Sequence, residues 1–513
     1  MSGLPSGWIV APLGEVADVQ LGKMLDRKRT EGTSLPYLRN VNVRWGHIDV
    51  SDLLEMPFRD HELGRYAVKP GDVMVCEGGE PGRAAVWTRH DEGIKYQKAL
   101  HRVRVGAGLL PNWLVYQLHL DASNGRLAKQ FTGTTIGHLP REAIVEYRLR
   151  LAPLPEQRRI VEVIESYFTR LDDAVATLER VQQNLKRYRA SVLRAAVEGR
   201  LVPTEAELAR AEGRDYEPAS ALLERILAER RRRWHEAGAR GKYHGPVAPD
   251  TADLPELPEG WCWATMDHFV YTIEAGKNFR CIEIPPGPSD VGVVKVSAVT
   301  WESFDEDESK TCPRSELVNE THFISPGDFL ISRANTIKLV GACVIVNTIQ
   351  RRLMLSDKIL RLQTVGGLDW WLLWVLRSVL GRREIESLAT GNQESMRNIG
   401  QAGIRRIRIP VPPEAECRRI ISEIERQTSV FEHSMSVIWQ SEERCWRLRQ
   451  SILKWAFEGR LADQDPSDEP ASALLERIRS ETSASRQTAS NSRVSRIVSI
   501  QKRRRAPSGR QTR

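Results

Sequence analysis

The stretch Glu217-Pro-Ala-Ser-Ala-Leu-Leu-Glu-Arg-Ile226 occurs a second time, letter for letter, as residues 469–478. The tetrapeptide Glu198-Gly-Arg-Leu201 recurs in the same way at 458–461. Ten identical residues in a row are not a chance similarity, and self-similarity at a fixed interval indicates a repeated architecture. Because the interval is about half of the chain, the sequence predicts two copies of one folding unit.

Further matches upstream show that the repeat runs through most of the chain. Trp8 and Trp261 each follow a Leu-Pro-x-Gly sequence. Pro70-Gly-Asp72 matches Pro326-Gly-Asp328 at an offset of 256 residues. Arg158-Arg-Ile160 matches residues 418–420 at an offset of 260. The offset between matching residues increases only slightly along the chain, which indicates short loop insertions. The residues between these anchors differ freely, which favours one shared scaffold that carries two different surfaces.

Composition predicts a globular cytoplasmic protein with no membrane partner. A chain of 513 residues with 41% hydrophobic content has room for more than one domain. The N-terminus lacks the basic start and apolar run of a signal peptide. The longest apolar run, 368–376, is far shorter than the ~20 residues that span a membrane. Seven cysteines without a Cys-x-x-Cys motif indicate free thiols, not a disulfide framework or a zinc site.

The positive charge of the chain is concentrated at its end. From Arg479 onward there are ten basic residues and one acidic residue, whereas the whole chain has a formal net charge of +8. The rest of the protein is therefore close to neutral. We expect a disordered tail that either adds non-specific attraction for phosphate or has no role. Any specificity for nucleic acid must come from local surfaces elsewhere.

Two long helices are predicted by heptad spacing. Between Pro155 and Gly199 one apolar series is Ile164, Leu171, Leu178, Leu185 and Val192. A second helix from Pro413 to Gly459 keeps this spacing less strictly. Helices with such a seam pair with another helix, and ~45 residues span roughly 67 Å. We expect the two helices to pair with each other, antiparallel, as a spacer or docking surface.

The remaining segments indicate an α+β protein. Short β-branched runs such as 72–76, 84–87, 329–332 and 341–346 are typical of strands between Gly and Pro turns. Segments 113–120 and 370–380 favour helices packed on these strands. Motifs for adenine methylation, an ATP phosphate loop and a dinucleotide-binding loop are all missing.

This order resembles the specificity (S) subunit of type I restriction-modification enzymes, the HsdS family. The resemblance is carried by the paired helix entries 152–160 and 409–420, the two Glu-Gly-Arg-Leu ends, the duplicated decapeptide and the segment 71–83. The second helix entry departs from the usual Pro-x-x-Glu-Gln pattern, since Ala-Glu-Cys precedes Arg418.

The resemblance implies two mixed α/β target-recognition domains in tandem repeat, separated and joined by the two long helices as an antiparallel coiled coil. The expected parts are target-recognition domain 1 (1–152), conserved helical region 1 (153–234), a linker (235–256), target-recognition domain 2 (257–411), conserved helical region 2 (412–480) and a basic tail (481–513).

The resemblance also implies function and partners. The chain would read a bipartite, asymmetric site on double-stranded DNA without catalysing a reaction. It would carry two modification (methyltransferase) subunits, with restriction (translocase and endonuclease) subunits added for cleavage. The chain itself would bind no cofactor or metal, and S-adenosylmethionine, ATP and magnesium would be bound by the partner subunits.

Base contacts require polar or cationic side chains on loops that reach the edges of the grooves. The repeat alignment selects two sets of such residues. Candidates in the first domain are Arg39, Asn40, Asn42, Arg83, Lys98, Thr134 and Thr135. Those in the second are Lys295, Ser297, Arg333, Asn335, Lys358, Asn392, Gln393 and Arg397. For any one of them a surface role or a phosphate contact is an open alternative.

The duplicated decapeptide also predicts two equivalent apolar patches for two copies of one partner. The patch residues are Leu222, Leu223 and Ile226 in the first copy, and Leu474, Leu475 and Ile478 in the second. Phe168, Val175, Met435 and Trp439 broaden the seams of the long helices, which indicates a further surface to be covered.

Two other classes of function would require different features of the sequence. A fused nuclease or methyltransferase would require a catalytic motif that the sequence lacks. A purely structural coiled-coil protein would explain the helices but not two diverged domains of about 150 residues.

Overall fold

The computed structural model describes residues 3–24, 31–91, 93–133, 137–236, 242–393 and 396–480. The chain forms two compact units, described separately below. Unit 1 consists of residues 1–178 and 440–513, and unit 2 of residues 179–439. Both units contain helices and strands, so the mixed helix-and-strand class predicted from the sequence is confirmed.

The strands of unit 1 form one four-stranded sheet and several smaller ones. Its strands are β1 (Ile9–Pro12), β2 (Ala17–Leu21), β3 (Thr33–Leu38), β4 (Val43–Arg44), β5 (His47–Ile48), β6 (Leu54–Phe58), β7 (Val73–Cys76), β8 (Ala84–Val86), β9 (Lys95–Tyr96), β10 (Leu100–Val105) and β11 (Arg148–Leu151). The four-stranded sheet has the order β2-β10-β7-β8, with antiparallel neighbours. The order β6-β3-β9 describes a second sheet, and β1 pairs with β11.

Helices cover these strands. They are α1 (Leu13–Val16), α2 (Asp60–Leu63), α3 (Pro111–Ser123), α4 (Arg141–Val145) and the first part of α5 (Leu154–Val197). Short 3-10 turns cover Asn40–Asn42 and Leu127–Gln130. Trp113 on α3 is fully buried in the core, where it packs edge-on against Trp8.

Unit 2 repeats the same sheet order. Its strands are β12 (Cys262–Thr265), β13 (Val270–Ala275), β14 (Val291–Val294), β15 (Ser309–Thr311), β16 (Phe329–Ser332), β17 (Ala334–Asn335), β18 (Cys343–Ile345), β19 (Arg352–Met354), β20 (Ile359–Thr364), β21 (Thr390–Gln393), β22 (Met396–Asn398) and β23 (Arg408–Val411). The order β13-β20-β16-β18 corresponds to the four-stranded sheet of unit 1, β15-β14-β19 to its second sheet, and β12-β23 to β1-β11. A further sheet, β17-β22-β21, is formed in unit 2.

The helices of unit 2 are α6 (Glu205–Glu212), α7 (Ala219–Glu236), α8 (Met266–Phe269), α9 (Asp369–Arg377), α10 (Val379–Leu388), α11 (Gln401–Arg406) and most of α12 (Glu414–Phe457). Three 3-10 turns cover Val296–Ala298, Ser315–Leu317 and Glu320–His322. Trp371 on α9 is fully buried, as is its counterpart Trp113, so the recurrent tryptophans at this position are core residues.

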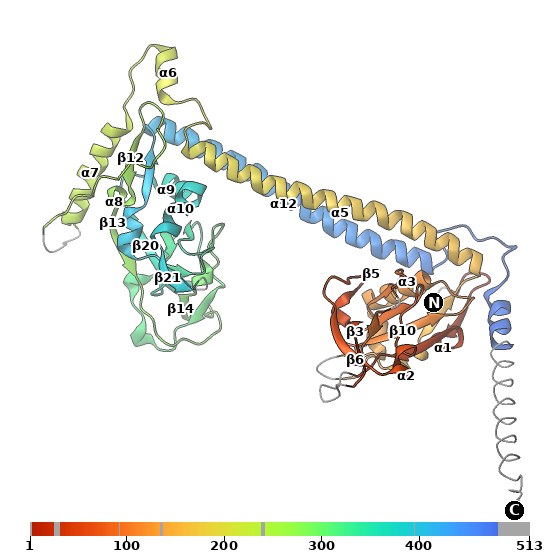
Figure 1. Cartoon of the computed structure of the whole chain (residues 1–513). Helices are drawn as coiled ribbons and strands as arrows, with labels where there is room; N and C mark the ends of the chain where they lie inside the picture. Colours follow the sequence, from red (N-terminus) through yellow and green to blue (C-terminus); the bar gives the residue numbers. More distant parts are fainter. Residues whose placement is uncertain are drawn as a thin grey trace, which may run out of the picture. The chain divides into compact units, whose positions relative to one another are not determined.

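The two long helices α5 and α12 have 44 residues each (Figure 1). Both end at a glycine in the left-handed region, Gly199 (φ 65°) and Gly459 (φ 67°). The amide of Arg200 donates to the carbonyl of Ala195, and that of Arg460 donates to the carbonyl of Trp455. These hydrogen bonds close the last turn of each helix. This geometry explains why Glu-Gly-Arg-Leu occurs at both helix ends.

The helix entries share a buried carboxylate, whereas the departure before Arg418 replaces Gln157, whose side chain bonds to Gly108, Leu110 and Ala152. Glu156 accepts a hydrogen bond from the indole of Trp8 (2.9 Å), and Glu416 accepts one from the indole of Trp261 (2.9 Å). Both carboxylates are buried. Glu416 is therefore the counterpart of Glu156, and Cys417 occupies the place of Gln157.

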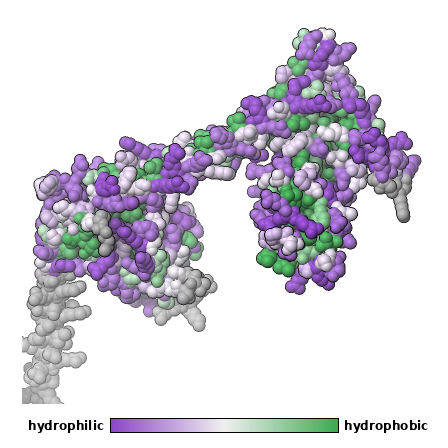
Figure 2. All heavy atoms as spheres, turned by 180° about the vertical axis from the view of Figure 1, so that it is seen from behind, coloured by the Kyte–Doolittle hydropathy of each residue, from purple (hydrophilic) through white to green (hydrophobic). Residues whose placement is uncertain are grey.

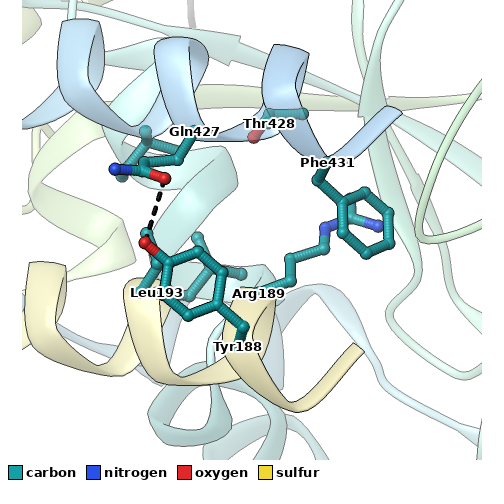
Figure 3. A pocket seen from close by; sticks show the side chains of 8 residues that line it. Tyr188, Arg189, Leu193, Gln427, Thr428 and Phe431 are labelled. Atoms are coloured by element: carbon teal, nitrogen blue, oxygen red, sulfur yellow. Dashed lines mark hydrogen bonds between the residues drawn. The ribbon is translucent and has the colours of Figure 1, made fainter. Parts of the chain in front are cut away.

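Within each unit, the segments of α5 and α12 run antiparallel. In unit 1, Arg159 contacts Asp468, whereas Asp172 contacts Arg449 earlier in α12. In unit 2, the hydroxyl of Tyr188 donates to Gln427 (3.1 Å; Figure 3), whereas the later residues Pro203 and Glu205 contact Arg419. A polar Gln427 is thus accommodated in the seam because it has a tyrosine partner across it.

The duplicated decapeptide starts a helix in each unit, α7 in unit 2 and residues 471–480 in unit 1. The amide of Ala219 donates to the carbonyl of Gly260 (2.8 Å), and that of Ala471 to Gly7 (2.9 Å). Both glycines have positive φ and precede the tryptophans of the Leu-Pro-x-Gly-Trp motifs. The decapeptide of one sequence repeat therefore packs on the strands of the other.

Candidate nucleic-acid interface

In each unit, several loops meet at one end of the four-stranded sheet. In unit 2, Ala275 at the end of β13 pairs with Leu360 of β20, and Ser332 at the end of β16 pairs with Ile359. Antiparallel neighbours place the end of one strand beside the start of the next. The loops after β13 and β16 and before β20 therefore leave the sheet together, at what we call the loop end.

The loop end of unit 2 brings together four of the predicted DNA-contacting residues. The amide of Arg333 donates to the carbonyl of Lys358 (2.9 Å). In the adjoining small sheet, Asn335 of β17 is directly opposite Arg397 of β22. The sequence placed these residues in separate segments, and strand pairing unites them.

Two of the cations at this loop end contact neutral groups. Arg333 donates from its Nε to the side-chain oxygen of Asn398 (3.4 Å), and Arg397 donates to the carbonyl of Gly391. Lys358 is exposed. Within the described residues, neither of these arginines nor Lys358 forms an ion pair with a carboxylate. Such a cluster attracts phosphate groups.

The same backbone frame in unit 1 carries different side chains. The amide of Glu77 donates to Ala99 (2.9 Å), as that of Arg333 does to Lys358. Leu139 donates to the carbonyl of Glu77 (2.8 Å), as Ile399 does to Arg333 (2.8 Å). Glu77 thus occupies the position of Arg333.

The neighbour of Glu77 also differs between the units. His138 is the counterpart of Asn398, and its Nδ1 is 3.8 Å from the carboxylate of Glu77. The sequence prediction missed Glu77 and His138. Glu77 could have been identified from the sequence, because the repeat offset of 256 aligns it with Arg333.

Two predicted residues of unit 1 support their own loops instead. Asn42 is 2% exposed, and its amide group donates to the carbonyls of Asp49 and Asp52. The guanidinium of Arg83 is held by Glu80 (2.6 Å) and by the carbonyl of Asn40 (2.9 Å). Asn42 and Arg83 are buried by hydrogen bonds within the unit, so their prediction as exposed loop residues is wrong.

The other candidates of unit 1 differ in accessibility. Arg39 forms an ion pair with Asp52 (2.7 Å). Asn40 donates to the carbonyl of Gly78 (3.2 Å), which ties it to the loop after β7. Lys98 is exposed and immediately precedes β10 at the loop end. Thr134 and Thr135 lie outside the described residues.

Two candidates of unit 2 share an acidic neighbour. The hydroxyl of Ser297 donates to Glu308 (2.5 Å), and the ammonium group of Lys295 is 3.9 Å from the same carboxylate. A negative charge beside both residues weakens their attraction for phosphate. The side chains of Asn392 and Gln393 are outside the part of the chain that the structure describes.

Of the six residues predicted as partner patches, three are buried and three are half-buried. Leu222, Ile226 and Leu475 are at most 4% exposed, and Leu223 and Ile478 pack against the same two cores. Leu474 lies against Gly108. Each short helix packs most of its apolar face on its own unit, so Leu222, Ile226 and Leu475 are not exposed patches. Docking at the other three residues stays a prediction.

Within the described ranges, no group of His, Cys, Asp and Glu could hold a metal ion. In the same ranges, no helix is long and apolar enough to cross a membrane.

Curated relatives of this chain share one description. The chain is 29% identical over 311 residues to the "Type I restriction enzyme EcoEI specificity subunit" of Escherichia coli. That match covers 60% of this chain and 51% of the relative, about half of its length. The chain is also 23% identical over 506 residues to the "Type I restriction enzyme EcoKI specificity subunit" of Escherichia coli (strain K12), covering 94% of this chain and 97% of the relative. No family model matches the chain.

A solved structure has the same fold. It belongs to a study described as the "structural basis underlying complex assembly and conformational transition of the type I R-M system". The TM-score is 0.60 at 19% identity, and the alignment covers 90% of this chain and 100% of the solved chain.

The two units thus share one strand order but carry different side chains at their loop ends. The comparisons confirm the resemblance found in the sequence: this chain is similar to curated specificity subunits of type I restriction-modification enzymes, and it shares the fold of the solved chain.

Proposed function

We propose that this chain is the DNA sequence-recognition subunit of a type I restriction-modification enzyme. It binds a bipartite, asymmetric site on double-stranded DNA in the cytoplasm. Residues 1–152 and 257–411 act as the two target-recognition domains, 153–234 and 412–480 as conserved helical regions, 235–256 as a linker and 481–513 as a basic tail.

One observation carries this proposal. Two sheets of the same strand order hold Glu77 and His138 at one loop end, and Arg333 and Asn398 at the other. Carboxylates accept hydrogen bonds from the amino group of cytosine, and arginine donates to guanine. Two sheets with the same strand order but different side chains at their loop ends fit two different half-sites. A duplication with a purely structural role would not require these side chains to differ.

The long helices are proposed to join the two domains as one antiparallel coiled coil. Antiparallel pairing within each unit supports this arrangement. A helix of 44 residues is about 66 Å long, which is enough to hold two small domains over half-sites that are one turn, roughly 34 Å, apart. The coiled coil would then set the number of unread bases between the half-sites.

Two modification subunits are proposed to dock on the helices, with restriction subunits joining that complex. The long helices retain exposed apolar side chains, among them Trp439 (61% exposed) and Trp446 (59% exposed) on α12. Apolar patches interrupt the polar surface along the paired long helices in Figure 2. Exposed tryptophans are typical of interface anchors, so they replace the buried leucines as the favoured docking residues.

The chain itself is proposed to be non-catalytic. Its relatives are described as specificity subunits. Adenine methylation with S-adenosylmethionine, and cleavage with ATP and magnesium, would be carried out by the partner subunits. A fused nuclease or methyltransferase predicts that the purified chain alone cuts DNA or binds S-adenosylmethionine.

The test is to express the chain with its modification subunit and to map methylated adenines by single-molecule sequencing. We expect methylation within one motif of two unlike half-sequences and a fixed spacer. The variant Glu77→Gln should relax the first half-sequence alone, and Arg333→Gln the second alone. Methylation that is independent of this chain, or a motif with one continuous block, would overturn the proposal.

A further inference from the structure

Two cysteines of unit 2 lie opposite each other on neighbouring extended segments. Ile282 and Thr311 form an isolated antiparallel bridge. Each donates its amide to the carbonyl of the other, both at 3.0 Å. Cys281 precedes Ile282 and Cys312 follows Thr311, so the two cysteines are opposite each other in the antiparallel register. They form a pair of the type that shares no backbone hydrogen bonds.

That position suits a cross-strand disulfide. Residues in an antiparallel pair without hydrogen bonds have Cα atoms about 4.5 Å apart and side chains on one face. Disulfides require a Cα separation of about 4.4–6.8 Å. Each thiol now donates to a carbonyl of its own segment, Cys281 to Phe279 (3.5 Å) and Cys312 to Arg314 (3.3 Å). A disulfide therefore requires both thiols to leave these carbonyls by rotation about their Cα–Cβ bonds.

Both thiols are accessible to a small oxidant, since each is half-buried. Burial, followed by the neighbouring Cys312, raises the pKa of the Cys281 thiol. Cys343 and Cys417, also in unit 2, are fully buried. Among the seven cysteines, the bridge at Ile282 singles out this pair by strand register.

We propose that Cys281 and Cys312 form a reversible disulfide that responds to the redox state of the cell. Both thiols lose their protons, one S–S bond forms, and the two electrons reduce a small-molecule disulfide to two thiols. All seven cysteines are free in the structure, as the sequence predicts, and the proposal adds an oxidised state for this pair.

The disulfide would secure a segment beside the loop end. Lys277 and Arg280 are exposed and follow β13, and Gly276 lies against the carbonyl of Leu355 close to Lys358. Cross-linking Cys281 to β15 restricts the segment that carries these two cations. An effect on reading the second half-site rests on the proposed function, whereas formation of the bond does not.

The test uses the full chain in buffers of oxidised and reduced glutathione, with acid quenching and peptide mass spectrometry. We expect a linked peptide containing Cys281 and Cys312, lighter by two hydrogens, that dithiothreitol separates. Cys281→Ser and Cys312→Ser should each abolish it. Cys262→Ser, at another half-buried thiol of unit 2, is the matched control and should leave it unchanged.

Trypsin provides a second readout, because it cleaves after Lys277 and Arg280. Cleavage there should slow several-fold in the oxidised chain and recover on reduction, and the rate should not respond to oxidation in Cys281→Ser. Separate glutathione adducts on the two cysteines without a linked peptide would overturn the proposal. A linked peptide in a chain that binds no DNA in either redox state would contradict only the proposed function.

Discussion

At the scale of single residues, Glu77 and Arg333 occupy equivalent positions with the same backbone role and different side chains. Both residues have the same backbone hydrogen bonds, so the strand frame does not depend on their side chains. The side chains instead face different polar neighbours, His138 and Asn398. A residue whose backbone supports the fold while its side chain varies is well suited to carry specificity.

We predict different effects for two cations of the same loop end. Arg333→Ala should cost about 1–3 kcal/mol of binding to the cognate site and relax one position of the second half-site, as expected for a base contact. Lys358→Ala, on an exposed lysine, should weaken binding to all sequences alike and reduce its salt dependence.

Titrations of DNA binding at several salt concentrations measure both effects. Arg210→Ala on α6 removes the same charge elsewhere in unit 2 and serves as the control. An unchanged motif in Arg333→Ala, together with a reduced salt slope, would identify Arg333 as a phosphate contact.

Glu416 gives unit 2 a pH dependence. Burial raises the pKa of this carboxyl group, and its bonds to Glu205 and Trp261 offset burial only in part. The folded state therefore binds the proton more tightly than the unfolded state. The stabilising contribution is complete below the unfolded pKa of about 4.3 and is lost as the pH rises through the folded pKa.

Protection of α6 from amide exchange, corrected for the intrinsic pH dependence, should thus increase as the pH falls from neutral towards that raised pKa. In Glu416→Gln the increase should disappear, because the amide does not titrate. The same slope in both proteins would show that another group is responsible.

At the scale of elements, the short helices are integral parts of the two units. Gly366 and Gly108 are counterparts that lie against Ile226 of α7 and against Leu474 and Ile478 of the helix at 471–480. The two helices share one sequence but meet different glycine conformations, since Gly366 has a φ of 86° and Gly108 does not have a positive φ.

These contacts predict unequal effects of one substitution. Gly366→Ala should destabilise the packing of α7 by about 1–3 kcal/mol, because a side chain is strained at positive φ and its Cβ would be 2.7 Å from Ile226. Gly108→Ala should cost less, because the ends of flexible side chains can move. Amide exchange of 219–236 and 471–480 measures both, and equal effects would show that backbone conformation is not the cause.

At the scale of the whole molecule, the proposed coiled coil acts as a ruler. Inserting one helical turn, about four residues, after Arg180 should change the length of the unread spacer and leave both half-sequences unchanged. The same insertion between residues 242 and 250, outside the helices and strands of unit 2, is the control and should change neither. Methylated-adenine mapping measures both, and altered half-sequences in the Arg180 insertion would contradict the ruler.

Much of this fold was predictable because it follows local rules. Heptad spacing, prolines at helix starts and glycines at helix ends act within a few residues of one another. They predicted the bounds of α5 and α12 to within two residues. The repeated anchors predicted one shared scaffold, and the two units have the same order of strands in their main sheets. The resemblance to specificity subunits rests on the same local motifs.

Only the tertiary structure decided which polar and apolar side chains remain available. Asn42 and Arg83 are residue types that contact bases from loops, yet here they bind carbonyl groups and a carboxylate that lie nearby in space. Glu77 and His138 are 61 residues apart and meet through strand pairing. Leu222 and Leu475 are covered because each decapeptide helix packs on the strands of the other repeat. Burial and hydrogen bonding depend on contacts between distant segments, and those contacts are determined by the packing of the whole chain.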